Sequence, residues 1–409
     1  MSTVLDNFLR YVKIDTQSLP DADCYPSTKK QLDLLHLLYE ELKAMGAQNV
    51  RMAEEGYVYA TIPANVSDAE IPALGFIAHV DTSDAVSGKD VKPRIVENYE
   101  GGVIVLNEAL GMELNPGDYP VMLKHIGEDF IVTDGTTLLG ADDKAGVAEI
   151  MAAAKYLLDH PEIPHGTVQI GFTPDEEVGR GVEFFDVEGF GADFAYTIDG
   201  DDVGGIEYEN FNAANLRIVI QGKSIHPGSA KGHMVNSLLV AMELQQMLPA
   251  FENPAYTEGY EGFYHLTDLA GSCEKTTMEY ILRDHDEEKL EGKLLYIERT
   301  ADFLNQKYGA GTVQVVKLGS YRNMKEKILP HMHLIENAKK ALERIGVTPV
   351  VQPIRGGTDG ANLSWKGLPC PNLCTGGQNF HGCYEYITVQ NLEKCTRMIL
   401  EIIKIYAEQ

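Results

Sequence analysis

The stretch "TVQIGFTPDEEVG", residues 167–179, joins a short apolar run to two adjacent glutamates, Glu176 and Glu177. Such a run is typical of a buried strand, because its apolar side chains leave little for solvent to contact. Two neighbouring carboxylates repel each other, so a pair that follows a buried strand needs a positive or protonated partner. The stretch therefore predicts a strand that ends at a charged site.

Similar runs recur on both sides of this stretch, at residues 58–64, 73–80 and 194–200. Helical spacing of apolar residues predicts helices over residues 27–46 and 142–161. Ser27 is the expected cap and Gly46 the expected stop of the first helix, and Pro161 should end the second. Short apolar strands separated by helices indicate an α/β fold, with a mostly parallel sheet flanked by helices.

The order of the predicted strands and helices changes over residues 208–322. Strand and helix patterns there follow the order β-α-β-β-α-β, with a long helix over residues 287–308, which is the split βαβ of a ferredoxin-like unit. After residue 322 the alternation of apolar strands and helices resumes. We therefore expect a discontinuous catalytic domain, residues 1–207 and 323–409, interrupted by an α+β domain, residues 208–322.

Length and composition agree with this organisation and exclude several functions. A chain of 409 residues exceeds the usual size of one domain. The net charge of −27 opposes binding to nucleic acid or to an anionic membrane. No run is long and apolar enough to span a bilayer, and no signal peptide is evident. The six cysteines contain no C-x-x-C motif, so reduced thiols in a cytoplasmic protein are expected rather than a zinc knuckle.

Functional sites of open α/β sheets lie outside the carboxyl ends of the strands, and charged side chains recur at these positions in the sequence. The candidates are His79 and Asp81 in "HVD", Asp142 and Asp143 in "GADDKAG", Glu176 and Glu177 in "PDEEVG", Asp199 in "TIDG" and His381 in "NFHG". Each has a simpler explanation when taken alone, such as a surface pair, a helix cap or a solvated loop. Their convergence at comparable positions predicts a dinuclear site for zinc, cobalt or manganese.

Together these motifs resemble those of the M20 metallopeptidases, and the resemblance extends through "HPGSAKG", "TEGYEGFYHL", "PIRGGTDGA" and "GLPCPNL". It implies a dizinc exopeptidase-like catalytic domain with an inserted lid, and an aminopeptidase that removes the N-terminal residue of tripeptides. Two divalent metal ions, most simply zinc, are implied. His79 and Asp199 would hold one, Glu177 and His381 the other, and Asp142 would bridge them.

The resemblance also implies roles for the side chains around the metal ligands. Glu176, next to a ligand but not one itself, would be the general base and later the general acid. Asp81 would bind the second ring nitrogen of His79 and fix its tautomer, as carboxylates beside a ligand histidine do. Asp143 and Lys144 are interpreted as an ordinary ion pair at a helix start.

Three residues are candidates for contacts with the substrate. His226 resembles a lid histidine that stabilises the tetrahedral oxyanion, although it could also be a turn residue before proline. Arg283 or Arg355 could hold the terminal carboxylate of the substrate, since the arginine fork matches that group, or either could form a structural ion pair.

Three functions remain open at this point. The first is the tripeptide aminopeptidase. The second keeps the chemistry but acts on dipeptides or N-acyl amino acids, and the third is a catalytically silent peptide-binding relative. An unligated glutamate beside a complete ligand set argues against the third, because a binding protein has no need of a base. Small peptides are the expected partners, with a homodimer as a further expectation.

Overall fold

The computed structural model describes residues 3–66 and 71–409, which fall into two compact units. The larger unit contains Met1–Tyr208, Glu326–Gln352 and Thr358–Gln409, and the smaller contains Glu209–Lys325 and Pro353–Gly357. No feature of the sequence indicated that Pro353–Gly357 returns to the smaller unit. It does so because Ile354 forms a parallel bridge with Asn210, at the start of that unit.

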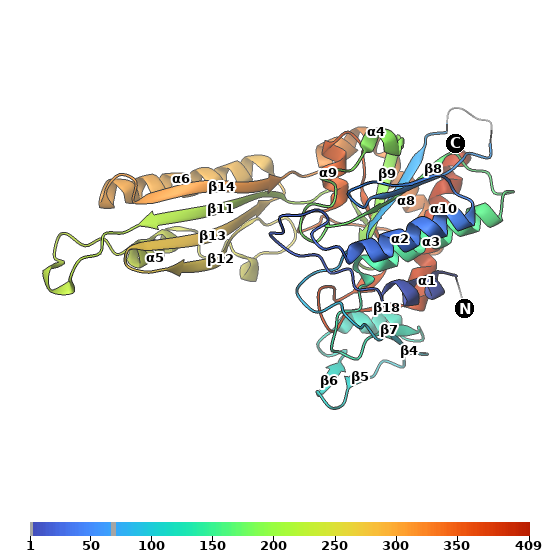
Figure 1. Ribbon diagram of the computed structural model, residues 1–409, viewed down its shortest axis with the longest axis horizontal. Helices are drawn as coiled ribbons and strands as arrows, with labels where there is room; N and C mark the ends of the chain where they lie inside the picture. Colours follow the sequence, from blue (N-terminus) through green and yellow to red (C-terminus); the bar gives the residue numbers. More distant parts are fainter. Residues whose placement is uncertain (1–2, 67–70) are drawn as a thin grey trace. The chain divides into compact units, whose positions relative to one another are not determined.

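The larger unit is built on a mixed sheet of eight strands (Figure 1). In spatial order these are β1 (Gln48–Met52), β2 (Val58–Ile62), β8 (Val168–Thr173), β3 (Leu74–His79), β9 (Phe194–Gly200), β16 (Asn372–Cys374), β10 (Gly205–Glu207) and β15 (Val350–Val351). The central strands β8, β3, β9 and β16 are parallel, as predicted, whereas β1, β2 and β10 add antiparallel pairs outside them.

Helices cover both faces of this sheet. They are α1 (Thr3–Tyr11), α2 (Gln31–Met45), α3 (Ala141–Asp159), α4 (Val187–Phe190), α8 (His333–Arg344), α9 (Asp359–Trp365) and α10 (Val389–Ala407), with the short α7 (Lys325–Ile328) and η4 (Leu329–His331) before α8. Phe76 of β3 packs with side chains of α3 and α10, while its neighbour Ile77 packs with Phe190 of α4 and Leu363 of α9. Consecutive strand residues point to opposite faces, so both faces of β3 are buried.

The ends of the two predicted helices differ in one respect from the expectation. Gly46 ends α2 in the left-handed conformation, with φ 91°, and α3 ends before Pro161, as predicted. Ser27 does not cap α2, because the helix begins at Gln31. Instead, the Ser27 hydroxyl and backbone N–H donate to the carboxylate of Asp175, at 2.5 and 2.6 Å.

A smaller sheet, which sequence reasoning missed, lies in the same unit. It pairs β17 (Gly377–Gln378), β18 (Tyr386–Thr388), β7 (Phe130–Val132) and β4 (Arg94–Val96), and a hairpin of β5 (Ile104–Asn107) and β6 (Met112–Leu114) and the turn η1 (Pro120–His125) accompany it. Its own core includes Phe130 and Tyr386, whose rings stack with centroids 4.9 Å apart. The segment between β17 and β18 carries His381, one of the predicted metal ligands.

The smaller unit has the predicted β-α-β-β-α-β order (Figure 1). Its elements are β11 (Asn212–Gln221), α5 (Ser237–Met247), β12 (Phe263–Gly271), β13 (Lys275–Asp284), α6 (Glu287–Tyr308) and β14 (Val313–Tyr321), with the turns η2 (Pro227–Ser229) and η3 (Pro254–Tyr256). The strands form one antiparallel sheet, ordered β12-β13-β11-β14. Leu216, Ile218 and Ile220 alternate along β11 and share a core with Val240 of α5 and Ile297 of α6.

None of the helices within the described residues is long and apolar enough to cross a membrane.

Candidate metal centre

The sequence-predicted ligands of the larger unit meet at the carboxyl ends of three neighbouring parallel strands. His79 is the last residue of β3, Asp199 lies near the end of β9, and Glu177 follows β8. Asp142 sits in the first turn of α3, where its backbone angles are not helical. His381 has a left-handed φ of 61°. Elements far apart in the sequence therefore converge on one place.

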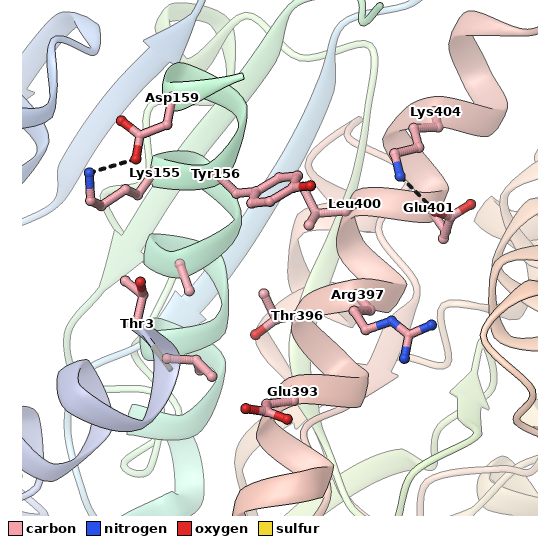
Figure 2. A pocket seen from close by; sticks show the side chains of 12 residues that line it. Thr3, Lys155, Tyr156, Asp159, Glu393, Thr396, Arg397, Leu400, Glu401 and Lys404 are labelled. Carbon is pink, nitrogen blue, oxygen red and sulfur yellow. Dashed lines mark hydrogen bonds and ion pairs between the residues drawn. The ribbon is translucent and has the colours of Figure 1, made fainter. Parts of the chain in front are cut away.

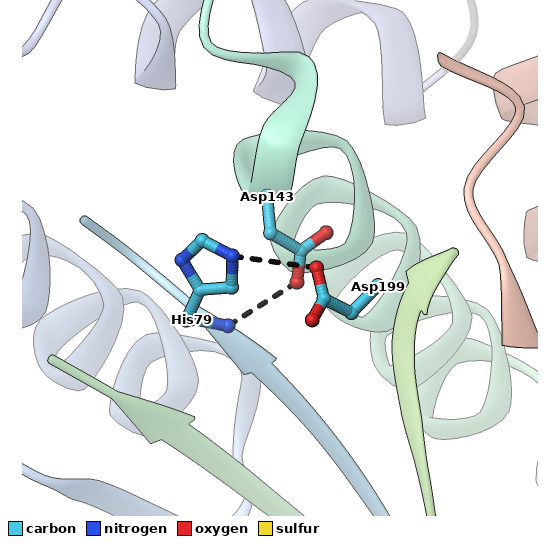
Figure 3. A group of neighbouring side chains, drawn as sticks. All are labelled: His79, Asp143 and Asp199. Carbon is cyan, nitrogen blue, oxygen red and sulfur yellow. Dashed lines mark hydrogen bonds and ion pairs between the residues drawn. The ribbon is translucent and has the colours of Figure 1, made fainter. Parts of the chain in front are cut away.

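His79 is surrounded by carboxylates. Its Nε2 lies 3.0 Å from Asp142 Oδ1 and 3.3 Å from Asp199 Oδ1, as Figure 3 shows for Asp199. Burial alone would lower the pKa of His79, but these carboxylates outweigh it and raise that pKa well above its usual value. Burial also raises the pKa of Asp199, to about 6, although His79 opposes the shift.

His381 makes the matching contacts on the other side of Asp142. Its Nε2 lies 2.9 Å from Asp142 Oδ2 and 3.0 Å from Glu177 Oε2. These contacts raise the pKa of His381 to about 11, with Asp142 the larger cause. Asp142 thus presents one carboxylate oxygen to each histidine, which is the arrangement expected of a bridging group.

The two glutamates of the pair have different surroundings. Besides the contact of Oε2 with His381, Glu177 has a buried Oε1 without a hydrogen-bond partner among the described residues. Burial and the charge of Asp142 raise the pKa of Glu177 to about 7. Burial, with the nearby charge of Asp199, also holds the pKa of Glu176 well above its usual value. The crowding of acids is therefore costly unless cations or protons neutralise it.

Asp81 anchors this pair and faces His79. Its Oδ1 accepts the backbone N–H of Glu176 at 3.0 Å, and its Oδ2 accepts that of Glu177 at 3.2 Å. The Nδ1 of His79 lies 3.3 Å from Asp81 Oδ1 and 3.1 Å from the backbone carbonyl of Asp81. Asp81 therefore orients both a candidate ligand and the turn that carries Glu176 and Glu177.

Asp143 and Lys144 do not form the ion pair that the sequence suggested. The carboxylate of Asp143 accepts the backbone N–H of His79 (Figure 3) and that of Gly146, both at 3.2 Å. The buried ammonium of Lys144 donates to the carbonyl of Ile14 at 2.7 Å, and burial lowers its pKa to about 8. The prediction failed because helix-start spacing does not reveal that both side chains point into the interior.

Further buried acids hold the surrounding backbone, and sequence reasoning missed them. Asp175, directly before the glutamate pair, has a left-handed φ of 61° and accepts bonds from Ser27 and from Gln31 Nε2. Asp359, at the start of α9, accepts the hydroxyl of Thr173 at 2.9 Å. Position after a strand or at a helix start was the only available signal for these residues.

The donor set fits divalent cations. Two groups of side chains could each place ligand atoms within 4.8 Å of one another, namely His79, Asp143, Asp199 and His79, Asp142, Glu177. Imidazole nitrogen and carboxylate oxygen are the ligands that zinc, cobalt and manganese accept. The unpartnered Oε1 of Glu177 and the crowded carboxylates are the features that a cation would satisfy.

A hollow elsewhere in the larger unit has a different character. It measures about 560 Å³ and is lined by side chains of α1, α3 and α10 (Figure 2). Its lysines are already paired along their own helices, Lys155 with Asp159 and Lys404 with Glu401, each at 2.8 Å. No histidine lines it. The hollow therefore lacks the converging ligands of the centre at His79.

The three candidate substrate contacts lie in the smaller unit. Both Nη groups of Arg355 have acceptors: Nη1 donates to the carbonyls of Gly259 (2.7 Å) and Glu261 (3.0 Å), and Nη2 donates to the carbonyl and the hydroxyl of Thr257. Among the described residues, Arg283 donates only through Nη1, to Asn215 and to the carbonyl of Leu282, and it stacks on Tyr321. Exposed His226 accepts the backbone N–H of Gly228 at 3.1 Å.

His226 and Arg283 lie at opposite ends of the smaller unit's sheet. Arg283 pairs with Ala213 at the start of β11, whereas His226 follows Gln221, the last residue of that strand. At roughly 3.3 Å per residue, the strand separates these ends by about 26 Å. An extended tripeptide spans only about 10 Å. The ends of the strand that lie near these two side chains are therefore farther apart than the length of an extended tripeptide.

Comparison with known proteins places this arrangement in a family. The sequence pattern of "Peptidase family M20/M25/M40" matches residues 132–405. The chain belongs to that family. Peptidase T of Alkaliphilus oremlandii is 56% identical to this M20 peptidase over 409 residues, which is 100% of both chains.

Solved structures share the fold of this M20 peptidase. A tripeptidase from Staphylococcus aureus matches it with a TM-score of 0.80 at 24% identity, covering 100% of this chain and 98% of that one. A dinuclear metal-binding peptidase of the M20 family from Bacillus subtilis matches with a TM-score of 0.62 at 16% identity, covering 99% and 98%. The predicted α/β fold with its inserted α+β unit is confirmed.

Proposed function

We propose that this M20 peptidase is a metal-dependent aminopeptidase that releases the N-terminal residue of tripeptides. The main support for the proposal is the position of Asp142 between two histidines. Its Oδ1 lies 3.0 Å from His79 Nε2, and its Oδ2 lies 2.9 Å from His381 Nε2. Asp199 and Glu177 flank these histidines, and Glu176 stands beside them. The full-length similarity to proteins named Peptidase T supports the choice of substrate.

Two divalent cations would be held by the predicted ligands. His79 and Asp199 would hold one, Glu177 and His381 the other, and Asp142 would bridge them. The alternative bridge, Asp143, is disfavoured because both its oxygens already accept backbone N–H groups. Zinc is the proposed metal, and cobalt or manganese would suit the same oxygen and nitrogen ligands.

The protein's own residues would handle the proton. Cations bound here would lower the pKa of a water molecule and polarise the scissile carbonyl. Glu176 would accept the proton of the attacking water and donate it to the leaving amine, as a general base and then a general acid. Asp81 would keep Glu176 in place through its backbone N–H and keep His79 in one tautomer.

Recognition of the substrate carboxylate is assigned to Arg283. Four acceptors already occupy the two Nη groups of Arg355, so that residue is better suited to hold the Thr257–Glu261 segment. Arg283 donates only through Nη1 to the described residues, so its Nε and Nη2 would be left for a carboxylate.

His226 would stabilise the oxyanion, but not beside the Arg283 of its own chain. The separation of about 26 Å along β11 supports a homodimer in which one subunit supplies His226 to the other. Mixing His226→Ala with Glu176→Ala subunits tests this arrangement. Transfer between subunits predicts recovery of about a quarter of wild-type activity, because half of the dimers are mixed and each has one intact site. Action within one chain predicts no recovery.

The second candidate, a dipeptidase or N-acyl-amino-acid amidohydrolase, keeps the metal centre and changes the substrate. A catalytically silent binding protein is disfavoured by Glu176, whose carboxylate bonds to none of the described residues and has no structural task. We place the enzyme in the cytoplasm, in keeping with its thiols, none of which is bridged among the described residues.

Metal analysis combined with a peptide panel tests the proposal. The purified protein should contain about two divalent metals per chain and cleave tripeptides faster than dipeptides or tetrapeptides. N-acetylation of the tripeptide should abolish cleavage, because an aminopeptidase requires the free amine. Faster turnover of the acetylated peptide would instead establish the amidohydrolase.

A further inference from the structure

Glu385 collects the backbone N–H groups around the start of α3. Its Oε2 accepts those of Leu139 and Gly140, at 2.6 and 2.7 Å, and its Oε1 accepts that of Asp142 at 3.1 Å. The side chain is buried, with the residue only 2% exposed. All three bonds cross more than 240 residues of sequence, so no local pattern announces them.

These N–H groups have no partner within α3. The first N–H groups of a helix lack carbonyls one turn earlier, and buried groups of this kind need a substitute. Gly140 at the cap has φ 82°, and Asp142 has φ −85° and ψ 104°, so the backbone leaves helical geometry where Asp142 must face both histidines. The carboxylate of Glu385 supplies the acceptors that this irregular turn requires.

Glu385 also belongs to the segment that carries His381. Asn379 and His381 both have left-handed φ values, and Asn379 Nδ2 donates to the carbonyl of Tyr384 at 3.1 Å, which closes the segment just before Glu385. One carboxylate therefore joins the segment of His381 to the turn of Asp142. The side chains of Asp142 and His381, which meet at 2.9 Å, therefore lie on two segments that the carboxylate of Glu385 connects.

We infer that Glu385 is a positioning residue that sets Asp142 against His381, and that its carboxylate increases metal affinity without touching the metal. The inference rests on the proposed metal centre. A carboxylate that merely stabilised the fold would change the free energy of unfolding and leave the affinity of the folded protein for metal unchanged.

Two variants and one matched control isolate this role. Glu385→Gln keeps the size of the side chain but turns an amide NH₂ toward backbone N–H donors, so at least one bond becomes a clash of donors. Glu385→Asp keeps the charge with a shorter reach and should recover part of the effect. Glu149→Gln is the control, because Glu149 is a buried acid on α3 whose two oxygens have no partner among the described residues.

Cobalt(II) binding to the metal-free proteins is the measurement, by competition with a chromophoric chelator. Loss of a group that orients ligands typically costs 10–100-fold in metal affinity, and we expect that loss for Glu385→Gln. Its cobalt absorption bands should also shift, because the ligands change position. Glu385→Asp should fall between Glu385→Gln and the unaltered protein, and Glu149→Gln should match the latter. Urea unfolding of each metal-free protein provides the stability reference.

The outcomes separate the roles. Unchanged cobalt affinity and absorption in folded Glu385→Gln would overturn the inference, even with a lowered urea midpoint. If Glu385→Gln does not fold, Glu385→Asp decides by the same criteria, and failure of both to fold would show a role in the fold alone. An equal loss of affinity in Glu149→Gln would overturn it too. Absence of cobalt binding by the unaltered protein would instead refute the proposed metal centre, and this inference with it.

Discussion

Truncation of each glutamate in the pair should separate catalysis from metal binding. The backbone N–H of Glu176 is held by Asp81 at 3.0 Å, and its carboxylate bonds to none of the described residues. Glu176→Ala should therefore leave the turn and the ligands in place and remove only the proton carrier. Loss of such a group costs about 10²–10⁴-fold in kcat, which is about 2.7–5.4 kcal/mol at 1.36 kcal/mol per decade.

Glu177→Ala should fail in the opposite way. Its Oε2 lies 3.0 Å from His381, and its buried Oε1 has no hydrogen-bond partner among the described residues, so truncation would remove a proposed metal ligand. We expect the loss of one metal per chain, with activity partly restored by excess metal.

Metal stoichiometry and kcat, measured on both variants in parallel, test this assignment. Glu176→Ala should retain both metals and bind tripeptide with a KM close to that of the unaltered protein. Loss of metal from Glu176→Ala with retention by Glu177→Ala would reverse the roles of base and ligand. Full activity and full metal content in both would refute the mechanism.

Other parts of the structure make separate predictions. Prolonged chelation should remove activity, and zinc, cobalt or manganese should restore it; turnover by a rigorously metal-free preparation would refute the metal centre. Arg283→Ala should raise KM for tripeptides with little change in the urea midpoint, whereas Arg355→Ala should lower the midpoint, because it frees the Thr257–Glu261 segment; the reverse pattern would exchange their roles. Gly146→Ala should destabilise the fold by about 3 kcal/mol or more, since its Cβ would lie 2.0 Å from the carbonyl oxygen of Ile198; an unchanged urea midpoint would contradict this packing.

Most of the fold and of the candidate site was predicted from the apolar pattern of the strands and from the polar residues at their ends. Residues 73–80 and 194–200 were predicted as strands, and they contain the adjacent parallel strands β3 and β9. Parallel strands end at the same edge of a sheet. The proximity of their terminal side chains could therefore be predicted without knowledge of the tertiary structure. The long helix predicted over residues 287–308 coincides with α6, and its start is marked by Asp286, whose side chain accepts the backbone N–H of Lys289.

Contacts between a side chain and a distant backbone could not be predicted in this way. Serine is a common helix-capping residue, but the Ser27 hydroxyl instead donates to Asp175, 148 residues away. Glu385 and Asp175 have no neighbouring pattern that identifies their partners. The sheet of β17, β18, β7 and β4 was missed for a related reason, because strands of two or three residues give too few positions for a period to appear.

The adjacency of Glu176 and Glu177 follows from the single group that anchors them. Asp81 accepts their consecutive backbone N–H groups, so both side chains leave the same anchored turn. Asp175, held by Ser27 and Gln31 in the left-handed conformation, sets the start of that turn. Any displacement of the turn moves both glutamates together and preserves the spacing between the proposed base and the proposed ligand. Residues farther apart in sequence could occupy the same places, but they would not share one anchor, and their separation would vary with the motion of two segments instead of one.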